Sequence, residues 1–263
     1  MDEGASLSLP QLSALEDSRL GEPSDTDFAD TLYDRAMAIA NDLYDPDAYA
    51  LLGVPPEERI EREIAYLRRR SFGEWYFGAV TPARQITLLP DSEVLLKLRL
   101  TQQIVEETRH YEIFAAAVKR RNGEWRLQRY SVPSHLREML STQVSSASAA
   151  ELAAANQYSG EVVLSVHDRQ EKNVLRLVTS PDIMKDIETI EADEPAHIAI
   201  GRDLVRMYAG DIRERRAMAR AQEDFLMALS RQHVAELEAL GLQRLRGLPV
   251  FAPATPPHGP ALL

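Results

Sequence analysis

The stretch from Thr101 to Phe114 reads TQQIVEETRHYEIF and places two glutamates and a histidine inside a sequence with helical periodicity. In steps of four and three residues, the apolar seam of this helix passes through Leu100, Glu107, His110 and Phe114. Glu107 and His110 are therefore predicted to face the protein core. A buried carboxylate loses its hydration at a cost of several kcal/mol, so a positive charge is expected beside it.

A second stretch, DEPAH at residues 193 to 197, repeats the pattern. The same walk along the helix from Ile183 reaches Glu194 and His197 at equivalent places on the seam. Two helices are thus expected to present Glu-x-x-His to the core. A pair of bound metal ions between them would supply the missing positive charge.

Two metal ions held between four helices need one further carboxylate from each of the other two helices. Glu74 lies thirty-three residues before Glu107, and Glu161 lies thirty-three residues before Glu194. Both Glu74 and Glu161 fall on the apolar seam of a predicted helix. The chain is therefore predicted to be a pseudo-repeat of two helical hairpins that together supply four glutamates and two histidines.

Helical periodicity and turn-forming residues divide the rest of the chain. Asp91 and Ser92 are expected to cap the third helix, and Asn122-Gly123 to end it. The long irregular connection expected at 123–146 indicates a bundle with one long crossover. The predicted helices span 25–43, 56–80, 92–121, 147–179, 182–209 and 211–241.

The two ends of the chain differ from its centre in composition. Residues 1–24 and 247–263 are rich in Pro, Gly, Ser or acidic side chains and are expected to be arms without a core of their own. Residues 25–246 are predicted to form one helical domain. Neither a basic leader nor a run of about 18 apolar residues occurs, so a cytoplasmic protein without a membrane partner is expected.

Charge and cysteine content exclude several classes of function. The net charge of −11 argues against a nucleic-acid partner, because such proteins neutralise phosphates with basic side chains. The absence of cysteine excludes disulfides, thiolate catalysis, Cys-ligated zinc and iron–sulfur clusters. The arginines at 68–70 are expected on a solvated or partner-facing surface. His167 and His233 are assigned no role.

Over residues 56–209 the chain resembles the ferritin-like di-iron carboxylate superfamily. EETRH at 106–110 and DEPAH at 193–197 are similar to the ligand motifs of soluble acyl-carrier-protein desaturases and bacterial multicomponent monooxygenases. The resemblance implies an all-α, ferritin-like four-helix bundle with additional N- and C-terminal helices. The expected metal ligands are Glu74, Glu107, His110, Glu161, Glu194 and His197.

The resemblance also assigns the acid that precedes each ligand glutamate. Asp193 is expected to accept a hydrogen bond from His110, and Glu106 one from His197. Such a bond fixes the free N–H of a metal-bound imidazole.

Glutamate and histidine donors suit iron or manganese. The resemblance implies that two iron ions, or an iron and a manganese ion, activate O2 to hydroxylate, N-oxygenate or desaturate a small organic or carrier-bound substrate. The residues expected around the substrate are Gln103, Phe114, Gln157 and Ile190, with Phe77, Gly78 and Gly201.

Partners follow from what the chain lacks. It contains no flavin or nicotinamide fingerprint, so a separate ferredoxin or reductase is expected to supply electrons. That donor is expected to dock on the acidic surface or on the arginines at 68–70. A homodimer through the outer helices is also expected.

Three alternatives stay open at this point. The protein could be an iron-handling ferroxidase or store, or a radical protein like the small subunit of ribonucleotide reductase. Phe114 disfavours the latter, because that family usually has a radical tyrosine there. The six polar residues could also form a purely structural network in a helical bundle.

The sequence around Glu194 permits more than one local structure. Pro195 favours a kink or a π-type irregularity at the metal site. The alternative is a new helix that begins at Asp193 or Glu194, with Pro195 in its first turn. Glu191 could add a further carboxylate to the centre, although a surface position or an outer contact is favoured.

Overall fold

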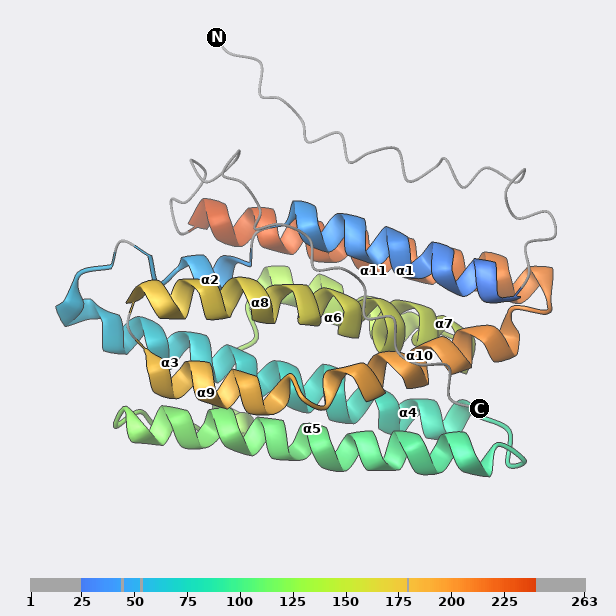
Figure 1. Cartoon of the computed structure of the whole chain (residues 1–263), viewed down its shortest axis with the longest axis horizontal. Helices are drawn as coiled ribbons and strands as arrows, with labels where there is room; N and C mark the ends of the chain where they lie inside the picture. The colour runs from blue at the N-terminus through green and yellow to red at the C-terminus, as the bar shows by residue number, and fades with distance from the viewer. Residues whose placement is uncertain (1–24, 44, 53, 179, 240–263) are drawn as a thin grey trace, which may run out of the picture.

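The computed structural model describes residues 25–43, 45–52, 54–178 and 180–239. Within these ranges every regular element is helical, which confirms the all-α prediction (Figure 1). The predicted arms 1–24 and 247–263 lie outside the described residues. In the part of the chain that is described, no helix combines the length and apolar character that crossing a membrane requires.

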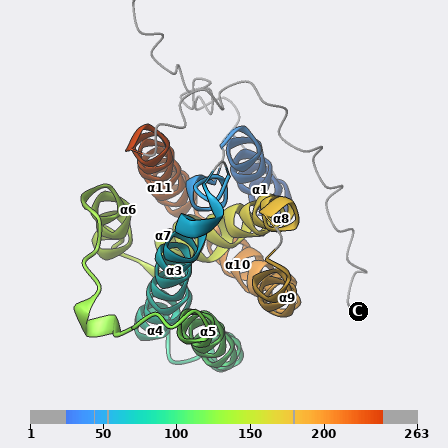
Figure 2. The same ribbon diagram turned by 90° about the vertical axis from the view of Figure 1, so that its left-hand side faces the viewer.

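Four helical segments carry the predicted metal ligands. In chain order they are α3 (Pro56–Gly73), η2 (Glu74–Val80) and α4 (Thr81–Leu88); α5 (Val94–Arg120); α7 (Ala149–Leu152), η4 (Ala153–Gly160) and α8 (Glu161–Val178); α9 (Pro181–Ile190) and α10 (Glu194–Tyr208). The segments η2 and η4 are π-helical. The first segment packs along α5, while α10 packs on η4 and α8 packs on α9, so the four segments lie side by side (Figure 2).

The remaining helices cover one side of these segments. They are α1 (Asp25–Asp42), α2 (Pro46–Tyr49), η3 (Leu127–Arg129), α6 (Ser134–Ser145) and α11 (Ile212–Ala239). The long helix α11 packs against α6, α7 and η4, and α1 packs against α8. Figure 2 shows α1 and α11 as an outer layer on the same side of α8.

The third predicted helix ends as expected but begins differently. Asn122 has a positive φ of 58°, and the N–H of Gly123 donates to the carbonyl of Val118, which closes α5 at its C-terminus. At the other end, Glu93 precedes the first helical residue, and no side chain accepts a hydrogen bond from the first turn. The prediction that Asp91 or Ser92 caps this helix is therefore wrong.

The connection expected to be irregular at 123–146 contains a helix. Residues 134–145 form α6, in which Leu136 and Met139 are buried in a cluster with side chains of α11. The sequence LREML within it consists of good helix formers, but a helix of 12 residues is only marginally stable in isolation, so packing on α11 stabilises α6. The connection is nevertheless long, because α5 and α8 both run towards the left in Figure 1 and the chain must return between them.

The fifth predicted helix, 182–209, is two helices rather than one. Residues 191–193 form a turn between α9 and α10, Asp193 occupies the N-cap position, and Pro195 lies in the first turn of α10. A proline there sacrifices no helical hydrogen bond. The favoured kink or π irregularity at Pro195 is therefore wrong, and the π-helical turns lie instead at Glu74 and before Glu161.

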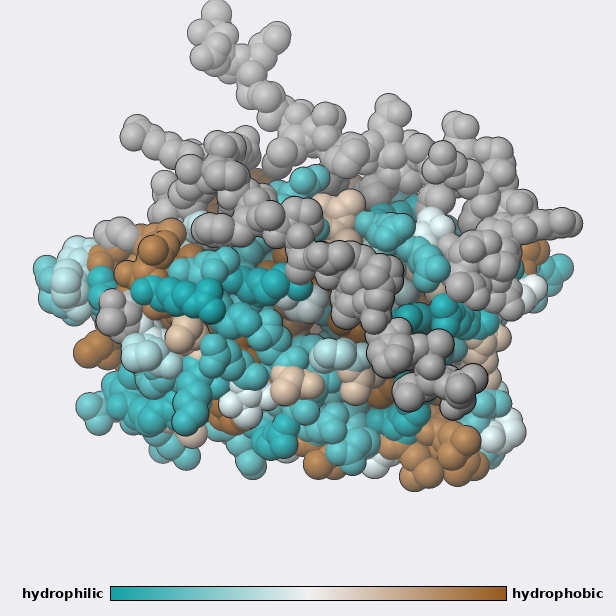
Figure 3. Space-filling view, in the orientation of Figure 1, coloured by the Kyte–Doolittle hydropathy of each residue, from teal (hydrophilic) through white to brown (hydrophobic). Residues whose placement is uncertain are grey.

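Apolar residues form clusters at both ends of the four segments. Leu67, Phe114, Ile187 and Ile190 belong to one cluster, and Leu100 belongs to another with side chains of α1, α7 and α10. The predicted ligands lie between these clusters. Figure 3 shows a hydrophobic surface near the start of α5, where Val94, Leu95 and Leu98 are exposed.

Candidate metal centre

The six predicted ligands come together in the core, and each side chain is at most 5% exposed. Their ligand atoms form two groups, and within each group these atoms lie within 4.8 Å of one another. Glu107 belongs to both groups, so its two carboxylate oxygens can serve two neighbouring ions. The first group is Glu74, Glu107 and His110, and the second is Glu107, Glu161, Glu194 and His197.

Helical spacing and two glycines place these side chains. An interval of three residues puts Glu107 and His110 on one face of α5, and does the same for Glu194 and His197 on α10. Gly78 faces Glu107 so closely that a Cβ atom would overlap the glutamate side chain. A side chain on Gly201 would lie 2.6 Å from the carbonyl oxygen of Gln157, so α10 can approach η4 only through a glycine.

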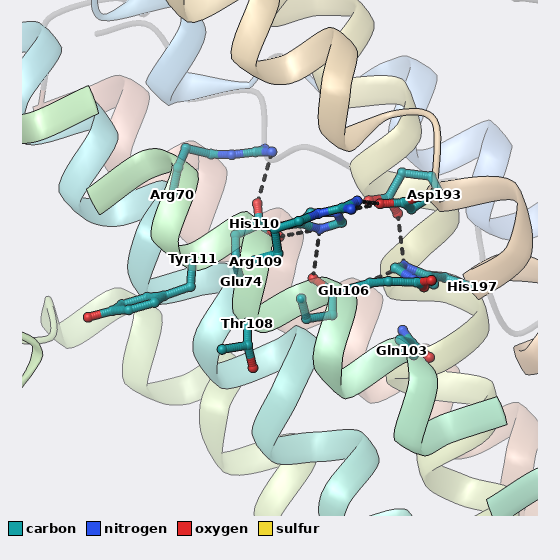
Figure 4. A network of polar contacts seen from close by, with 12 residues as sticks. Arg70, Glu74, Gln103, Glu106, Thr108, Arg109, His110, Tyr111, Asp193 and His197 are labelled. Carbon is teal, nitrogen blue, oxygen red and sulfur yellow. Dashed lines mark hydrogen bonds and ion pairs between the residues drawn. The ribbon is translucent and has the colours of Figure 1, made fainter. Parts of the chain in front are cut away.

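Each histidine is held by an acid from the other half of the molecule, as predicted (Figure 4). His110 Nε2 lies 3.0 Å from Oδ2 of Asp193, and His197 Nε2 lies 2.9 Å from Oε2 of Glu106. A carboxylate accepts the Nε2 proton, which leaves the Nδ1 lone pair for a metal. The Nδ1 atoms lie 3.2 and 3.1 Å from the two carboxylate oxygens of Glu107.

The protonation of the cluster reflects its crowded negative charge. Burial raises the pKa of Glu74 to about 8, although Arg70 opposes this shift. Burial and the charge of Glu194 raise the pKa of Glu161 well above its ordinary value. Without a metal, protons on such groups must neutralise part of the charge.

The pKa values of the two histidines are raised, whereas that of Glu107 is lowered. Burial alone would lower the pKa of both imidazoles, but their contacts with Glu107 raise it to about 9 for His110 and about 12 for His197. Burial would raise the pKa of Glu107, yet its hydrogen bonds with the two imidazoles lower it to about 2. Glu107 is therefore the carboxylate that stays ionised between two positive charges, the position that two metal ions would occupy.

Several ligand atoms are buried without a hydrogen-bond partner among the described residues. They include both carboxylate oxygens of Glu194, one of which faces Nδ1 of His197 at 3.7 Å. Buried polar atoms are nearly always paired, so atoms of this kind indicate a missing ligand. Carboxylate and imidazole donors suit iron or manganese, and the residues present fit a pair of such ions.

Arg70 is a part of the site that was missed in the sequence. Arg68 lies near the surface and donates to the backbone oxygen of Glu124, as expected for a solvated patch. Arg70 is instead buried, with nitrogens 3.1 Å from Glu74, 2.9 Å from Asp168 and 3.1 Å from Glu171. The prediction that all three arginines face solvent or a partner is therefore wrong for Arg70.

The four residues expected around the substrate are fully buried, but they do not line the cavity beside the site. Gln103 donates from Nε2 to Oε1 of Glu161 over 2.8 Å, and its own oxygen accepts from Gln157. The two glutamines therefore position a ligand carboxylate. Phe114 and Ile190 belong to the adjoining apolar cluster.

A cavity of about 160 Å³ lies on the opposite side of the ligands, between α3 with η2, α6, α8 and α11. Its wall includes the ligands Glu74, Glu107 and Glu161, together with Phe77 and Gly78, which the sequence placed near the metals. Gly201 does not line it. Most of the remaining wall is apolar, from Phe72, Leu136, Met139, Phe225 and Leu229.

Three further residues lie outside the two ligand groups: Glu191, His167 and His233. Glu191 pairs with Lys172 and belongs to neither ligand group, which agrees with the outer position favoured for it. His167 and His233 also line the cavity. No pattern along the sequence marks them, because they come from α8 and α11 and meet only in the folded chain.

Comparison with known proteins leaves the function open. No protein-family model matches the chain, and neither a curated protein nor a solved structure matches it. The ferritin-like resemblance therefore stays a prediction, and the geometry of the site is the basis for inferring function.

Proposed function

We propose that this protein is a ferritin-like di-iron oxidase or oxygenase that uses O2 to hydroxylate, N-oxygenate or desaturate an organic substrate. The proposal depends on one observation above all: two groups of buried ligands share Glu107 beside a cavity with mainly apolar walls. Parallel α5 and α8 segments, joined by a long connection, support the ferritin-like arrangement (Figure 1).

The ligand groups suggest how two ions would be shared. Glu74 and His110 would hold one ion, and Glu161, Glu194 and His197 the other, with Glu107 between them. When bound, a pair of iron ions supplies the redox and Lewis-acid chemistry that O2 activation requires. An iron–manganese pair has the same donor preferences.

The side chains around the ligands hold them in position and keep water away from the site. Asp193 and Glu106 accept the Nε2 protons of the two histidines and so fix the direction of both imidazoles. Gln103 fixes Glu161 by a hydrogen bond, and Arg70 fixes Glu74 by an ion pair. The nearly complete burial of the ligands keeps bulk water from the reacting atoms.

The cavity favours an organic substrate over an iron store. Its apolar wall meets the carboxylates of Glu74, Glu107 and Glu161, where an organic molecule would be in contact with the ions. A purely structural network is disfavoured, because such a network would satisfy the two oxygens of Glu194.

The proposed reaction needs an electron donor, and the chain has a surface that could bind a second copy. O2 activation coupled to hydroxylation requires two electrons from outside the chain, and a ferredoxin or reductase is the proposed donor. A homodimer stays a prediction, and the exposed Val94, Leu95 and Leu98 on α5 offer an apolar surface for such a contact.

The first experiment measures metal content per chain after anaerobic loading with ferrous iron, and then follows the optical spectrum as oxygen is admitted. About two irons per chain and a transient absorption band are expected in the wild type. Both should be lost in Glu107→Ala and kept in Glu112→Ala, a control on the exposed face of the same helix. Failure of the wild type to bind stoichiometric metal would contradict the proposal.

A further inference from the structure

The cavity beside the metal ligands ends in a second set of polar side chains, here named the distal end and defined by His167, Gln232 and His233. Along α8, Glu161 borders the cavity at the metal side and His167 borders it at the distal end. Gln232 and His233 approach from α11. The cavity therefore has a metal side, an apolar middle and a polar distal end.

Two atoms of the distal end are buried and unpartnered. His167 is 7% exposed and Gln232 is 2% exposed, and neither Nε2 of His167 nor Oε1 of Gln232 has a hydrogen-bond partner among the described residues. The Nε2 of Gln232 donates to Oε2 of Glu236 over 3.2 Å. Because a carboxylate only accepts, this bond fixes the amide and leaves its oxygen as an acceptor without a donor.

His233 makes the distal end richer in acceptors. Its Nδ1 donates to the backbone oxygen of Leu229 over 2.9 Å, so Nε2 is an acceptor in the neutral ring. Burial and the neighbouring His167 lower the pKa of His233 to about 3, which keeps the ring neutral. A ligand that satisfies the distal end must therefore bring a hydrogen-bond donor.

Both arginines that border the cavity are paired with carboxylates. Arg69 pairs with Glu236, and Arg70 pairs with Asp168 and Glu171. Asp45 also borders the distal end, where it opposes the positive charge of the arginines. An ionised ligand would lose its hydration without gaining a free counter-charge, so an uncharged ligand is favoured.

The size of the cavity limits the ligand to about one ring. Its volume of about 160 Å³ is close to the roughly 150 Å³ of an apolar protein cavity that binds benzene. His167 follows Glu161 by six residues, which corresponds to about 9 Å along the helix axis. A van der Waals contact at the metal side and a hydrogen bond at the distal end leave space for one six-membered ring.

We propose that the substrate is an uncharged molecule of about one ring, with an apolar body and a hydroxyl or amino group that donates to Gln232 and contacts His167. The opposite edge of the ring then faces Glu74, Glu107 and Glu161. The oxidation of this molecule rests on the proposed di-iron function, whereas its recognition needs only the cavity.

The test is the binding of two fluorinated probes to the full chain, followed by 19F NMR in the metal-free and the ferrous-loaded protein. 4-Fluorophenol carries the donor, and fluorobenzene has the same ring without it. Wild-type protein should bind 4-fluorophenol about tenfold more tightly, the usual effect of one buried hydrogen bond. Gln232→Leu should remove most of this ratio without weakening the binding of fluorobenzene, and His167→Phe should reduce the ratio as well.

The matched control is Gln143→Leu. Gln143 is also buried with unpartnered amide atoms, but it does not line the cavity, so its substitution should leave the ratio unchanged. Equal binding of the two probes to the wild type would overturn the proposal, as would a Gln232→Leu variant that weakens both equally. Iron content measured on the same samples separates the two proposals, because selective binding without iron contradicts only the di-iron function.

Discussion

The two halves of the molecule have the same spacing of ligands but different helices around them. Glu74 and Glu107 in the first half, and Glu161 and Glu194 in the second, are each thirty-three residues apart. In the first half α5 passes through the site without interruption, whereas the second half breaks at 191–193 and begins a new helix at Glu194. The positions of the ligands are therefore less variable than the helices that support them.

The halves also differ in how their carboxylates are compensated. Glu74 has the permanent cation Arg70 beside it, whereas Glu161 and Glu194 have His197, whose Nδ1 lies 3.7 Å from Oε2 of Glu194 and must lose its proton before it can bind a metal. The second half therefore depends more on a bound cation than the first. Three experiments test this difference between the halves.

The largest effect is expected at the carboxylate that both halves share. In Gly78→Ala the new Cβ overlaps the side chain of Glu107 and displaces it, so both ligand groups lose a member. Metal content should fall from about two ions per chain towards zero. Gly73→Ala is the matched control, because its Cβ would meet no atom within 4 Å. Elemental analysis would measure the metal content, and circular dichroism would check that the variants fold. A folded Gly78→Ala that keeps both ions would show that displacing Glu107 does not empty the site.

A smaller effect should separate the two metal sites by affinity. The second group has four ligands against three in the first, so it should bind the first equivalent of ferrous iron about tenfold more tightly than the first group binds the next. Anaerobic calorimetry should show that His197→Ala loses the tight step and His110→Ala the weak one. Loss of the tight step in His110→Ala would show that the first ligand group, and not the second, binds the first ion.

The smallest effect is a difference in pH dependence between the two binding steps. A protonated ligand must release its proton to the solvent before it binds a metal, so affinity rises with pH until the ligand is deprotonated. Glu74 has a pKa of about 8 and His110 of about 9, so the weak step should level off above these values. The pKa of His197 is about 12, so the tight step should continue to strengthen. Manganese titrations under argon at several pH values would measure the affinity of each step. If the halves were equivalent, the affinities of the two steps would change with pH in parallel.

The sequence predicts that these glutamates and histidines meet in the core, because their positions follow from helical periodicity, while metal binding stays a prediction. Glu107 and His110 share a face by spacing, and buried carboxylates require a partner wherever the helix lies. The crossed contacts of Asp193 and Glu106 were predicted from the family resemblance, and both are present.

The features that were not predicted depend on residues far apart in the chain. Arg70 belongs to a run of three arginines, and its partners Asp168 and Glu171 lie 98 and 101 residues away. The helix α6 is short, so it depends on its contacts with α11, which lies far from it in the sequence. The cavity exists only where these helices meet the ligand segments, so no local pattern could place it.

The position of Glu161 depends on the number of residues in the π-helical segment η4 that precedes it. Each residue of a helix turns the chain by about 100°, so one residue more or fewer in 153–160 rotates Glu161 away from its position relative to α7. The helix would continue, and the reading frame after an in-frame deletion would be intact, but one carboxylate would leave the centre. A single codon within η4 can therefore remove Glu161 from the cluster in a variant that keeps all six of the predicted ligand residues.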